Sequence, residues 1–404
     1  MNIISYVKKN GLKRTFAVFW QYKFDLLIQK AIMPFVKNKD LKNSIIIESH
    51  NDFDCNGGAF YNYLIEHEYN KKYRIIWLLK HPDKRPSKLP DNVECYGIYK
   101  PGFKKNYQIC TARFFLADNI VTNKKRKDQK SLYLGHGTGG LKNVKGIITF
   151  NDSVDYILIQ SPSYAPIQAE QYGLENKTEK LVFLGYPVHD ELLRNDRSEI
   201  KKVTDKQFRK IVMWMPTFRK CASGGAYSRS DSLKEQKFGI PLIENEDEFK
   251  ALNSKLKEMD VFLIIKIHPM QKLDSNMLTE QSNITILTGD SVKAKNIDNY
   301  RLMRCTDALI SDYSGVAYDY LQLNRPIGYV LDDMNDYKLG FVVDDIHTLL
   351  AGHEIYTLSD MYSFLTDVAD GVDRYKEKRE KIKDYIYLYN DTNNCKRLAE
   401  FMKL

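Results

Sequence analysis

The chain has 404 residues, of which 43% are hydrophobic and 28% charged, a composition that excludes a disordered or fibrous protein. Its length predicts two or three domains. The net charge of +9, from 61 Lys and Arg against 52 Asp and Glu, is modest, and we expect no nucleic-acid partner.

Most of this charge lies in residues 1–40, which carry eight basic and two acidic side chains, a net +6. Large apolar residues recur there in steps of three and four, as on one face of a helix. This pattern predicts a basic amphipathic segment that associates with a membrane surface. The alternative is an ordinary helix packed on the next domain with a solvated basic face. Gly11 and Pro34 are positions where the segment can break.

The six cysteines form no CxxC pair, which excludes zinc-ribbon and thioredoxin-like readings and fits a reducing compartment. No apolar run approaches the roughly 18 residues that a spanning helix needs. No signal peptide is evident either. Secretion and integral insertion into a membrane are therefore not expected.

Residues 41–200 are typical of an α/β domain. We expect strands at 44–48, 74–79, 114–117, 132–134, 156–159 and 181–184, a loop at 50–58 and a helix at 59–67. This alternation predicts a parallel, doubly wound sheet, whose ligands lie at the carboxyl ends of strands. A glycine-rich loop follows strand 132–134 and presents His136 as a candidate general base. The alternative is a tight turn whose histidine bonds only to backbone.

The pattern restarts in residues 205–375. We expect strands at 211–215, 261–267, 284–287, 308–310 and 326–331, and helices at 246–259, 299–305 and 316–323. His268 ends one strand, and its alternative role is that of a satisfied strand-end histidine. Ser314 and Gly315 begin a helix and predict a phosphate site, although Ser314 can equally be an N-cap. Arg219 follows a strand and can pair with a phosphate or be a solvated loop cation.

Several common nucleotide motifs are absent from the sequence. There is no GxxxxGK[ST] loop, no GxGxxG in a strand–helix context and no convincing acidic pair for a metal. Asp332–Asp333 and Asp344–Asp345 are expected to be loop acids. We therefore expect neither a cofactor nor a bound metal. Two α/β domains with facing strand-end loops predict a two-domain nucleotide-dependent transferase.

Eight short motifs resemble those of the CDP-glycerol glycerophosphotransferase family, which includes teichoic acid primases and polymerases. They occur, in the family's order, at 48–51, 112–119, 135–142, 185–190, 215–219, 266–269, 311–319 and 389–391. Gly135-His-Gly-Thr-Gly-Gly-Leu-Lys142 looks like the family's HGTPLK loop, Lys266-Ile-His-Pro269 is similar to KxHP, and Ser311-Asp-Tyr-Ser-Gly315 resembles TDYSS. The resemblance covers about residues 44–400.

The resemblance implies a GT-B architecture, with two facing Rossmann-like domains and a central cleft. Residues 41–200 would form the acceptor domain, residues 205–375 the CDP-donor domain and residues 376–404 a helical tail. The implied reaction transfers a polyol phosphate, most simply glycerol phosphate, from CDP-glycerol or CDP-ribitol to a lipid-linked or polymer acceptor in teichoic-acid or related polymer synthesis. The implied location is peripheral, on the cytoplasmic face of the cell membrane.

In this scheme His136 would act as general base and His268 would stabilise charge as CMP leaves. The substrate-binding residues would be Gly137, Thr138, Lys142, Thr217, Arg219, Lys266, Asp312, Tyr313, Ser314 and Gly315.

The sequence departs from the family's pattern at several positions. Gly139–Gly140 replace Pro and Leu, Gly315 replaces a serine, Val188–His189 replace an expected arginine, and Leu339–Phe341 replace an Arg-Gly-Phe stretch. Three alternatives remain open: a CDP-ribitol-using homologue, a GT-B glycosyltransferase using a nucleotide sugar, and a non-catalytic membrane-surface protein that binds an anionic polymer.

Overall fold

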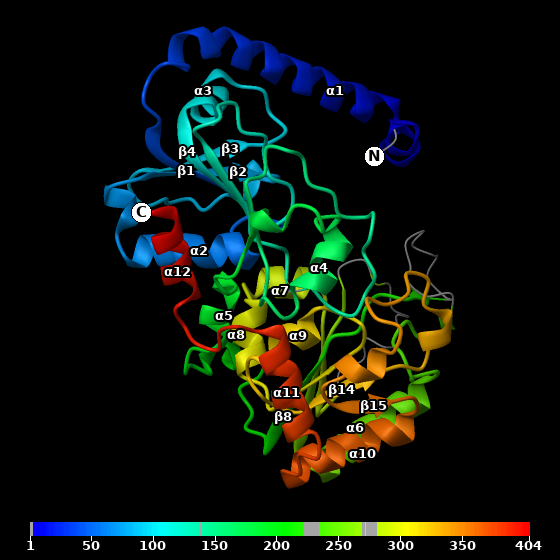
Figure 1. The fold of residues 1–404 in the computed structure, drawn as a ribbon. Helices are drawn as coiled ribbons and strands as arrows, with labels where there is room; N and C mark the ends of the chain where they lie inside the picture. The colour runs from blue at the N-terminus through cyan, green and yellow to red at the C-terminus, as the bar shows by residue number, and fades with distance from the viewer. Residues whose placement is uncertain (1–2, 138, 222–233, 269–270, 272–280) are drawn as a thin grey trace.

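The computed structural model describes residues 3–137, 139–221, 234–268, 271 and 281–404. Two α/β domains follow one another, and a long N-terminal helix lies across the first domain on the side away from the second (Figure 1). None of the helices in these described ranges is long and apolar enough to cross a membrane.

The described residues of the N-terminal domain form a parallel sheet of seven strands in the order β3-β2-β1-β4-β5-β6-β7. The strands are β1 (Lys42–Glu48), β2 (Arg74–Leu79), β3 (Val93–Gly97), β4 (Ala112–Ala117), β5 (Lys130–Tyr133), β6 (Tyr156–Leu158) and β7 (Leu181–Val182). The helices are α2 (Cys55–Glu66), α3 (Phe103–Thr111), α4 (Ala165–Tyr172) and α5 (Pro187–Leu192). The strand order reverses between β1 and β4, which places a crevice beside the loops after these strands.

The described residues of the C-terminal domain form a parallel sheet of six strands in the order β12-β11-β8-β13-β14-β15. The strands are β8 (Lys210–Trp214), β11 (Val261–Lys266), β12 (Ile284–Leu287), β13 (Ala308–Ser311), β14 (Ile327–Val330) and β15 (His353–Ile355). The helices are α6 (Glu246–Glu258), α7 (Gly289–Ala294), α8 (Asn299–Arg304), α9 (Val316–Leu321), α10 (Leu358–Asp370) and α11 (Lys376–Ile386). A small parallel pair, β9 (Lys220–Cys221) and β10 (Glu235–Gln236), stands apart.

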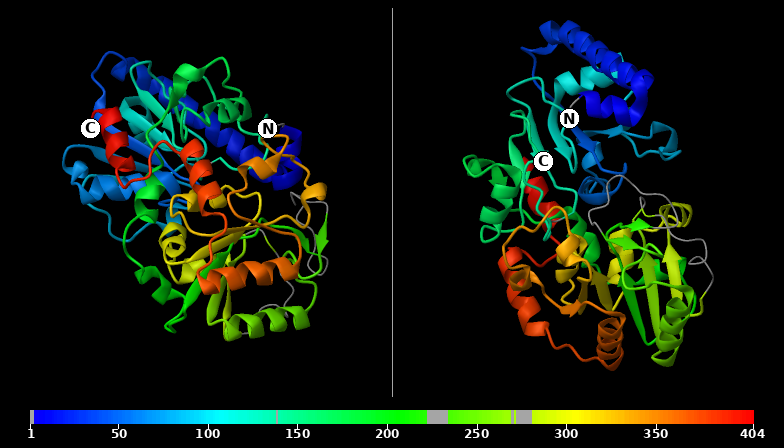
Figure 2. Two further views of the ribbon diagram at one scale, coloured as in Figure 1. Left: turned by 60° about the horizontal axis from the view of Figure 1, so that its bottom comes forward. Right: turned by 90° about the vertical axis from the view of Figure 1, so that its right-hand side faces the viewer.

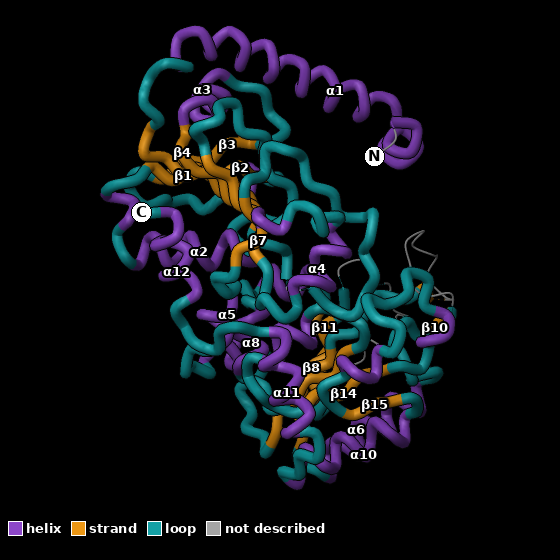
Figure 3. Tube along the Cα trace, in the orientation of Figure 1, coloured by secondary structure: helices purple, strands orange, loops and turns teal. Residues whose placement is uncertain are grey.

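The two groups of strands in Figure 3 confirm the predicted fold class. The central strands are continuous apolar runs, as in β1 and β2, because helices cover both faces of a parallel sheet. The edge strands β3 and β15 were not predicted, since their sequences VECYG and HEI are short and carry polar residues.

Helix α2 begins at Cys55, so the loop prediction for 55–58 is wrong. The side chain of Asp54 caps the helix by accepting a hydrogen bond from the N–H of Cys55. The two glycines that indicated a loop are needed for close packing instead. A Cβ atom on Gly58 would lie 2.4 Å from the carbonyl oxygen of Phe53, and one on Gly57 would lie 3.2 Å from that of Glu48.

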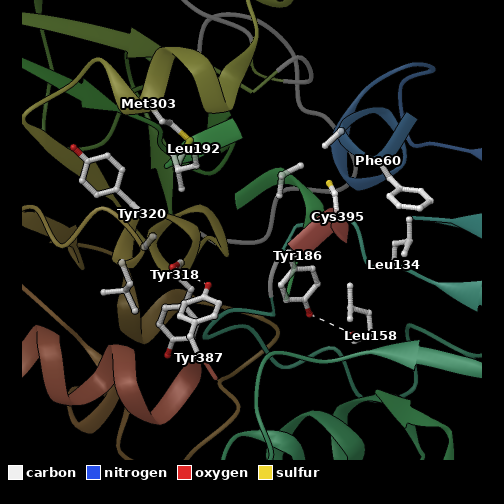
Figure 4. Close-up of a cluster of buried hydrophobic side chains, with 14 of the residues drawn as sticks. Phe60, Leu134, Leu158, Tyr186, Leu192, Met303, Tyr318, Tyr320, Tyr387 and Cys395 are labelled. Atoms are coloured by element: carbon white, nitrogen blue, oxygen red, sulfur yellow. Dashed lines mark hydrogen bonds between the residues drawn. The ribbon is translucent and has the colours of Figure 1, made fainter. Parts of the chain in front are cut away.

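The two domains share a buried cluster of hydrophobic side chains, in which Tyr186 of the N-terminal half lies near Tyr318 and Tyr387 of the C-terminal half (Figure 4). The last helix, α12 (Asn394–Met402), returns to the N-terminal domain and contacts α2 and α5 (Figure 2). Asp190 fixes it there by accepting hydrogen bonds from the backbone N–H groups of Asn394 and Cys395.

Helix α1 (Ile3–Val36) packs on α3 through its C-terminal half. A buried ion pair between Asp25 and Lys105, 2.6 Å apart, fixes the contact. Gly11 interrupts the helical geometry with a φ of 76°, as the sequence suggested, whereas Pro34 lies within the last turn and does not break the helix. Large apolar side chains remain exposed along α1: Leu12, Phe16, Phe19, Trp20, Phe24, Leu27 and Phe35.

Candidate active site

A cavity of about 370 Å³ lies between the domains, where loops from the carboxyl ends of both sheets meet. Open α/β sheets bind ligands at this place. Its polar lining from the N-terminal domain includes His50, Asp54, His136 and Lys142. The C-terminal domain contributes Thr217, Lys266, His268, Tyr300, Ser314 and Asp319.

His136 stands in the glycine-rich loop after β5 and stacks on His50, with ring centroids 4.1 Å apart and an interplanar angle of 17°. Gly135 and Gly137 on either side both have a φ of 77°, a conformation that favours glycine. His136 is an exposed residue on the wall of the cavity. Desolvation by the surrounding protein, with the charges of His50 and Lys80, nevertheless lowers its pKa to about 4.

His50 lies two residues after β1, and its backbone N–H donates to Asp118, the residue after β4, at 2.7 Å. Asp118 also accepts a hydrogen bond from the N–H of Gly57. Burial raises the pKa of Asp118 to about 8. Burial lowers the pKa of His50 below its usual value. Asp118 thus ties the loop that carries His50 and the first turn of α2 to the end of β4.

The loop between His50 and α2 is strained. Asp52, Phe53 and Cys55 all have positive φ values, between 53° and 57°, which are uncommon for residues other than glycine. Asp52 holds the loop by accepting hydrogen bonds from the backbone N–H groups of Lys80 and His81. Strain of this kind is found at functional sites, where it fixes side chains in one arrangement. Here it places Asp54 at the cavity.

Asp319 joins the two domains at the cavity. Its carboxylate lies 2.9 Å from Nε2 of His189 in α5, and it accepts a hydrogen bond from the hydroxyl of Tyr300 at 3.1 Å. Asp319 and His189 are both buried. His189 occupies the place where the family resemblance expects an arginine, and its ring supplies a polar partner for this carboxylate.

The loops after β8 and β13 are bound together by Asp312. It accepts hydrogen bonds from the N–H and the hydroxyl of Thr217, at 2.7 and 2.6 Å, and from the N–H of Ser314 at 3.1 Å. Asp312 is itself buried. It therefore positions the residues that line the cavity, and it does not line the cavity itself.

Arg219 is buried behind the same loops. Its guanidinium donates to Asp333 at 2.5 Å and to Asp312 at 3.2 Å, and these carboxylates raise its pKa. Tyr313 donates a hydrogen bond to Asp333 as well. Arg219 does not line the interdomain cavity. Asp333 lies in a turn, as the sequence predicted, and it is the buried partner of Arg219.

Lys266 and His268 end β11 on the C-terminal side of the cavity. Burial lowers the pKa of Lys266. The His268 ring lies 4.9 Å from the ring of Phe218, measured between centroids. On the opposite side, Lys142 has its Nζ 5.8 Å from the centre of the Tyr337 ring.

Eight of the predicted site residues line this one cavity: His136, Gly137, Lys142, Thr217, Lys266, His268, Ser314 and Gly315. Arg219, Asp312 and Tyr313 lie behind it, and Thr138 falls outside the described residues. Sequence reasoning missed His50, Asp54, Tyr300 and Asp319 as lining residues. His50 could have been found, because it follows a strand at the point where the strand order reverses.

The end of the glycine-rich loop contacts residues 339–341, one of the segments that depart from the family pattern. Residues Leu141–Asn143 of the N-terminal domain run beside Gly340–Val342 of the C-terminal domain. The N–H of Asn143 donates to the carbonyl of Gly340 at 3.1 Å, and that of Val342 donates to the carbonyl of Leu141 at 3.0 Å. The glycine-rich loop and residues 339–341 thus form one contact between the domains.

A larger hollow, of about 1080 Å³, lies at the other end of the N-terminal sheet. Lys37, Arg113, Lys130 and Phe401 are among its lining residues. It includes no residue of the C-terminal sheet. We regard the smaller interdomain cavity as the candidate active site, because the histidines and both sets of strand-end loops converge there. Among the described residues, no group of three or more His, Cys, Asp or Glu could hold a metal ion.

Two facing Rossmann-like domains with a polar cavity between their strand ends define an enzyme of the GT-B class of nucleotide-dependent transferases. Residues 31–403 match the family described as CDP-Glycerol:Poly(glycerophosphate) glycerophosphotransferase, and the chain belongs to this family. The family predicted from the eight motifs is confirmed.

Known relatives agree with this assignment, and a solved structure shares the fold. The chain is 26% identical over 316 residues to the teichoic acid glycerol-phosphate primase of Bacillus subtilis strain 168, covering 73% of each chain. It is 22% identical over 392 residues to the ribitol-phosphate polymerase TarK of Staphylococcus aureus strain NCTC 8325, covering 92% of this chain and 71% of the relative. The structure of the wall teichoic acid polymerase TagF has a similar fold, with a TM-score of 0.69, 19% identity and coverage of 95% and 97%.

Proposed function

We propose that the enzyme transfers glycerol phosphate from CDP-glycerol to a hydroxyl group of a lipid-linked or polymer acceptor, in the synthesis of a teichoic acid or related cell-surface polymer. The observation that carries this proposal is that His136 and His268, one from each domain, line a single cavity together with Lys142, Lys266 and Ser314. The family to which the chain belongs supports the choice of donor. The CDP end of the donor would lie against the C-terminal domain and the acceptor against the N-terminal domain.

In this reaction the acceptor oxygen bonds to the phosphorus that carries glycerol. The bond from this phosphorus to the CMP oxygen breaks, and CMP leaves with the electron pair. His136 takes the proton of the attacking hydroxyl. Its lowered pKa leaves the ring neutral at pH 7, as a base must be, and the negative charge of a bound diphosphate would raise that pKa toward a more effective value.

The C-terminal side of the cavity would stabilise the charge that moves to CMP. His268 and Lys266 stand at the end of β11, and Ser314 stands beside Gly315 at the start of α9. Such groups act by positioning and by electrostatic stabilisation, which supply most of the catalysis in phosphoryl transfer.

The test is CMP release from CDP-glycerol by His136→Asn and His268→Asn, with CDP-ribitol and nucleotide sugars assayed as rival donors. We expect each variant to lose about 100-fold or more in turnover. His67→Asn is the matched control, because His67 is an exposed histidine that does not line the cavity. Near-normal turnover by folded His136→Asn or His268→Asn would refute the role proposed for that histidine. A preference for CDP-ribitol over CDP-glycerol would show that CDP-ribitol is the donor.

We also propose that the enzyme attaches peripherally to the cytoplasmic face of the membrane through α1. Phe16 and Trp20 are 67% and 60% exposed, and Lys13 and Lys23 are exposed on the same helix. Aromatic and basic side chains together favour the interface of an anionic membrane. The buried pair of Asp25 and Lys105 supports the proposal, because it holds the helix to the catalytic domain.

A further inference from the structure

The larger hollow, of about 1080 Å³, takes no part in the proposed reaction. It lies at the amino ends of β4 and β5, whereas the catalytic loops of this domain follow the carboxyl ends of its strands. Its described lining residues include none that line the interdomain cavity. A molecule held in the hollow would therefore not touch the reacting atoms.

The hollow combines an apolar lining with an excess of positive charge. The apolar lining comes from β4, β5, β6 and α12: Phe114, Phe115, Leu116, Leu132, Tyr156, Phe401 and Met402. The charged lining is six basic and three acidic side chains: Lys37, Lys39, Arg113, Arg126, Lys130 and Lys403 against Asp40, Asp128 and Glu400. This combination is complementary to an amphiphile that carries a negatively charged group.

Arg113 is the basic residue that lacks a partner within the protein. It is partly buried in β4, and its side chain forms no hydrogen bond or ion pair with any described residue. Arg126, by contrast, donates to Asp128. Lys37 and Lys403 follow α1 and α12 directly, where the helix dipole favours positive charge. A guanidinium binds phosphate through two parallel hydrogen bonds, so an unpaired one on the wall of a hollow indicates a phosphate-bearing ligand.

The hollow continues the surface that α1 presents. Residues 37–41, which follow this helix, form part of the lining, and Phe35 in its last turn is 74% exposed. Arg126 ties the opposite wall to the helix, because its Nη1 donates to the carbonyl oxygen of Val36 at 2.9 Å. The head groups of a membrane that contacts α1 would therefore lie beside the basic residues of the hollow.

We propose that the hollow binds one anionic phospholipid of the membrane. The lipid phosphate pairs with Arg113 and with Lys130, which begins the neighbouring strand β5, and an acyl chain lies on the apolar lining. The lipid is an anchor and not a substrate. With α1 it gives the N-terminal domain two attachments to the bilayer, which prevent the domain from rotating about the helix axis. The inference rests on the proposed attachment of α1 for access to the bilayer.

The test uses dihexanoyl phosphatidylglycerol as a monomeric probe, below the concentration at which it forms micelles, and measures its binding to the full chain by calorimetry. We expect one molecule to bind saturably, with a Kd about tenfold or more higher for the double variant Arg113→Gln with Lys130→Gln. Dihexanoyl phosphatidylcholine, which has no net charge, should bind about tenfold more weakly. Glycerol 3-phosphate, which lacks acyl chains, should also bind about tenfold more weakly.

The double variant Lys23→Gln with Lys30→Gln is the matched control. It removes the same charge from exposed positions of α1 that do not line the hollow, so its Kd for the probe should not change. The proposal would be overturned by the absence of saturable binding, by an unchanged Kd in the folded Arg113 and Lys130 variant, or by an equal loss in the control. Equally tight binding of glycerol 3-phosphate would overturn it as well, because the site would then be one for free phosphate.

Turnover of CDP-glycerol with a soluble acceptor separates this proposal from the proposed function. The Arg113 and Lys130 variant should keep the turnover of the wild type, because both residues lie outside the catalytic cavity. If the wild type binds the probe in the expected pattern but releases no CMP, the proposed function fails and the lipid site stands. If it releases CMP but does not bind the probe, the lipid site fails and the proposed function stands.

Discussion

Gly140 of the N-terminal domain lies so close to Gly315 of the C-terminal domain that a Cβ atom on Gly140 would be 2.8 Å from the Cα of Gly315 and 2.9 Å from its N. The two glycines therefore bring backbone against backbone where the catalytic loops meet. Both positions depart from the family pattern, and their proximity provides a single structural reason for the two departures. The N-terminal loop can approach the turn at Ser314 and Gly315 only because Gly140 has no side chain.

Gly140→Ala should separate these loops, because the clash is with backbone and no side-chain rotation relieves it. A displacement of about 1 Å between reacting groups can cost about 100-fold in rate, so we expect a fall of that order in kcat/KM. The melting temperature should change little. The control is Gly102→Ala, since a Cβ atom at Gly102 would have nothing within 4 Å. Normal kinetics in Gly140→Ala would show that the approach is not required.

The acid limb of the rate profile should reveal the environment of His136. A general base is active when deprotonated, so kcat/KM should fall as the pH drops through about 4, and not near the usual histidine value of 6.5. His50→Ala admits water and removes the charge of the stacked ring. We expect this variant to move the acid limb upward toward pH 6.5. The measurement is kcat/KM from below pH 4 up to pH 8, and an unshifted profile in folded His50→Ala would contradict the role of the stacked pair.

Arg219 should matter for stability more than for donor binding. Its replacement by Met leaves Asp312 and Asp333 buried without their cation, a loss worth about 3–5 kcal/mol. Urea unfolding measures this loss in the free energy of unfolding directly. Arg219→Lys should recover only part of the lost stability, because lysine lacks the planar guanidinium that can bond two carboxylates at once. If Arg219 were instead a phosphate ligand, the variants would unfold normally and bind CDP-glycerol weakly.

Asp118 should make the fold less stable as the pH rises. Its pKa of about 8 in the folded protein lies above the usual 3.8, so the folded state binds more protons than the unfolded state between these values. Stability from this group is therefore full below about pH 4 and is lost as the pH rises through 8. Asp118→Asn keeps an acceptor oxygen but cannot ionise. Denaturant unfolding at several pH values should show a shallower decline for the variant, and equal slopes would contradict the raised pKa.

The exposed aromatic residues of α1 should carry membrane binding without affecting chemistry. Replacing Phe16 and Trp20 by Ser should reduce sedimentation with anionic liposomes severalfold, since it removes buried apolar area from the interface. Turnover with a soluble acceptor should stay unchanged. Tyr356→Ser, which removes an exposed aromatic residue from the C-terminal domain, is the control. Equal liposome binding by the wild type, the Phe16 and Trp20 double variant and Tyr356→Ser would refute attachment through α1.

Much of the fold was predictable because its central strands are apolar on both faces. Arg74–Leu79 and Ile284–Leu287 were predicted with their observed bounds, and the other predicted strands differ from the observed ones at their ends. The start of α2 was not predictable from local sequence. Gly57 and Gly58 indicate a turn in isolation, and only the backbone of Glu48 and Phe53 packed against them explains why glycine is needed within a helix.

The site was predictable where a residue lies in the loop that begins just after a strand, as with His136 and His268. Arg219 also follows a strand, but its partner Asp333 comes more than a hundred residues later, and no local pattern reveals that this pair is buried. The same limit applies to Asp319 and His189, which lie in different domains. Tertiary partners decided which strand-end residues face the cavity and which hold it together.

The return of α12 to the N-terminal domain determines how the cavity can open. The chain passes between the domains after α5 and again between α11 and α12, so two separate connections join them. These two connections define a hinge axis, the line that joins them. Rotation of one domain about this axis separates the loops that line the interdomain cavity, whereas rotation about any other axis strains both connections. Substrate entry and CMP release should therefore follow a single angular coordinate.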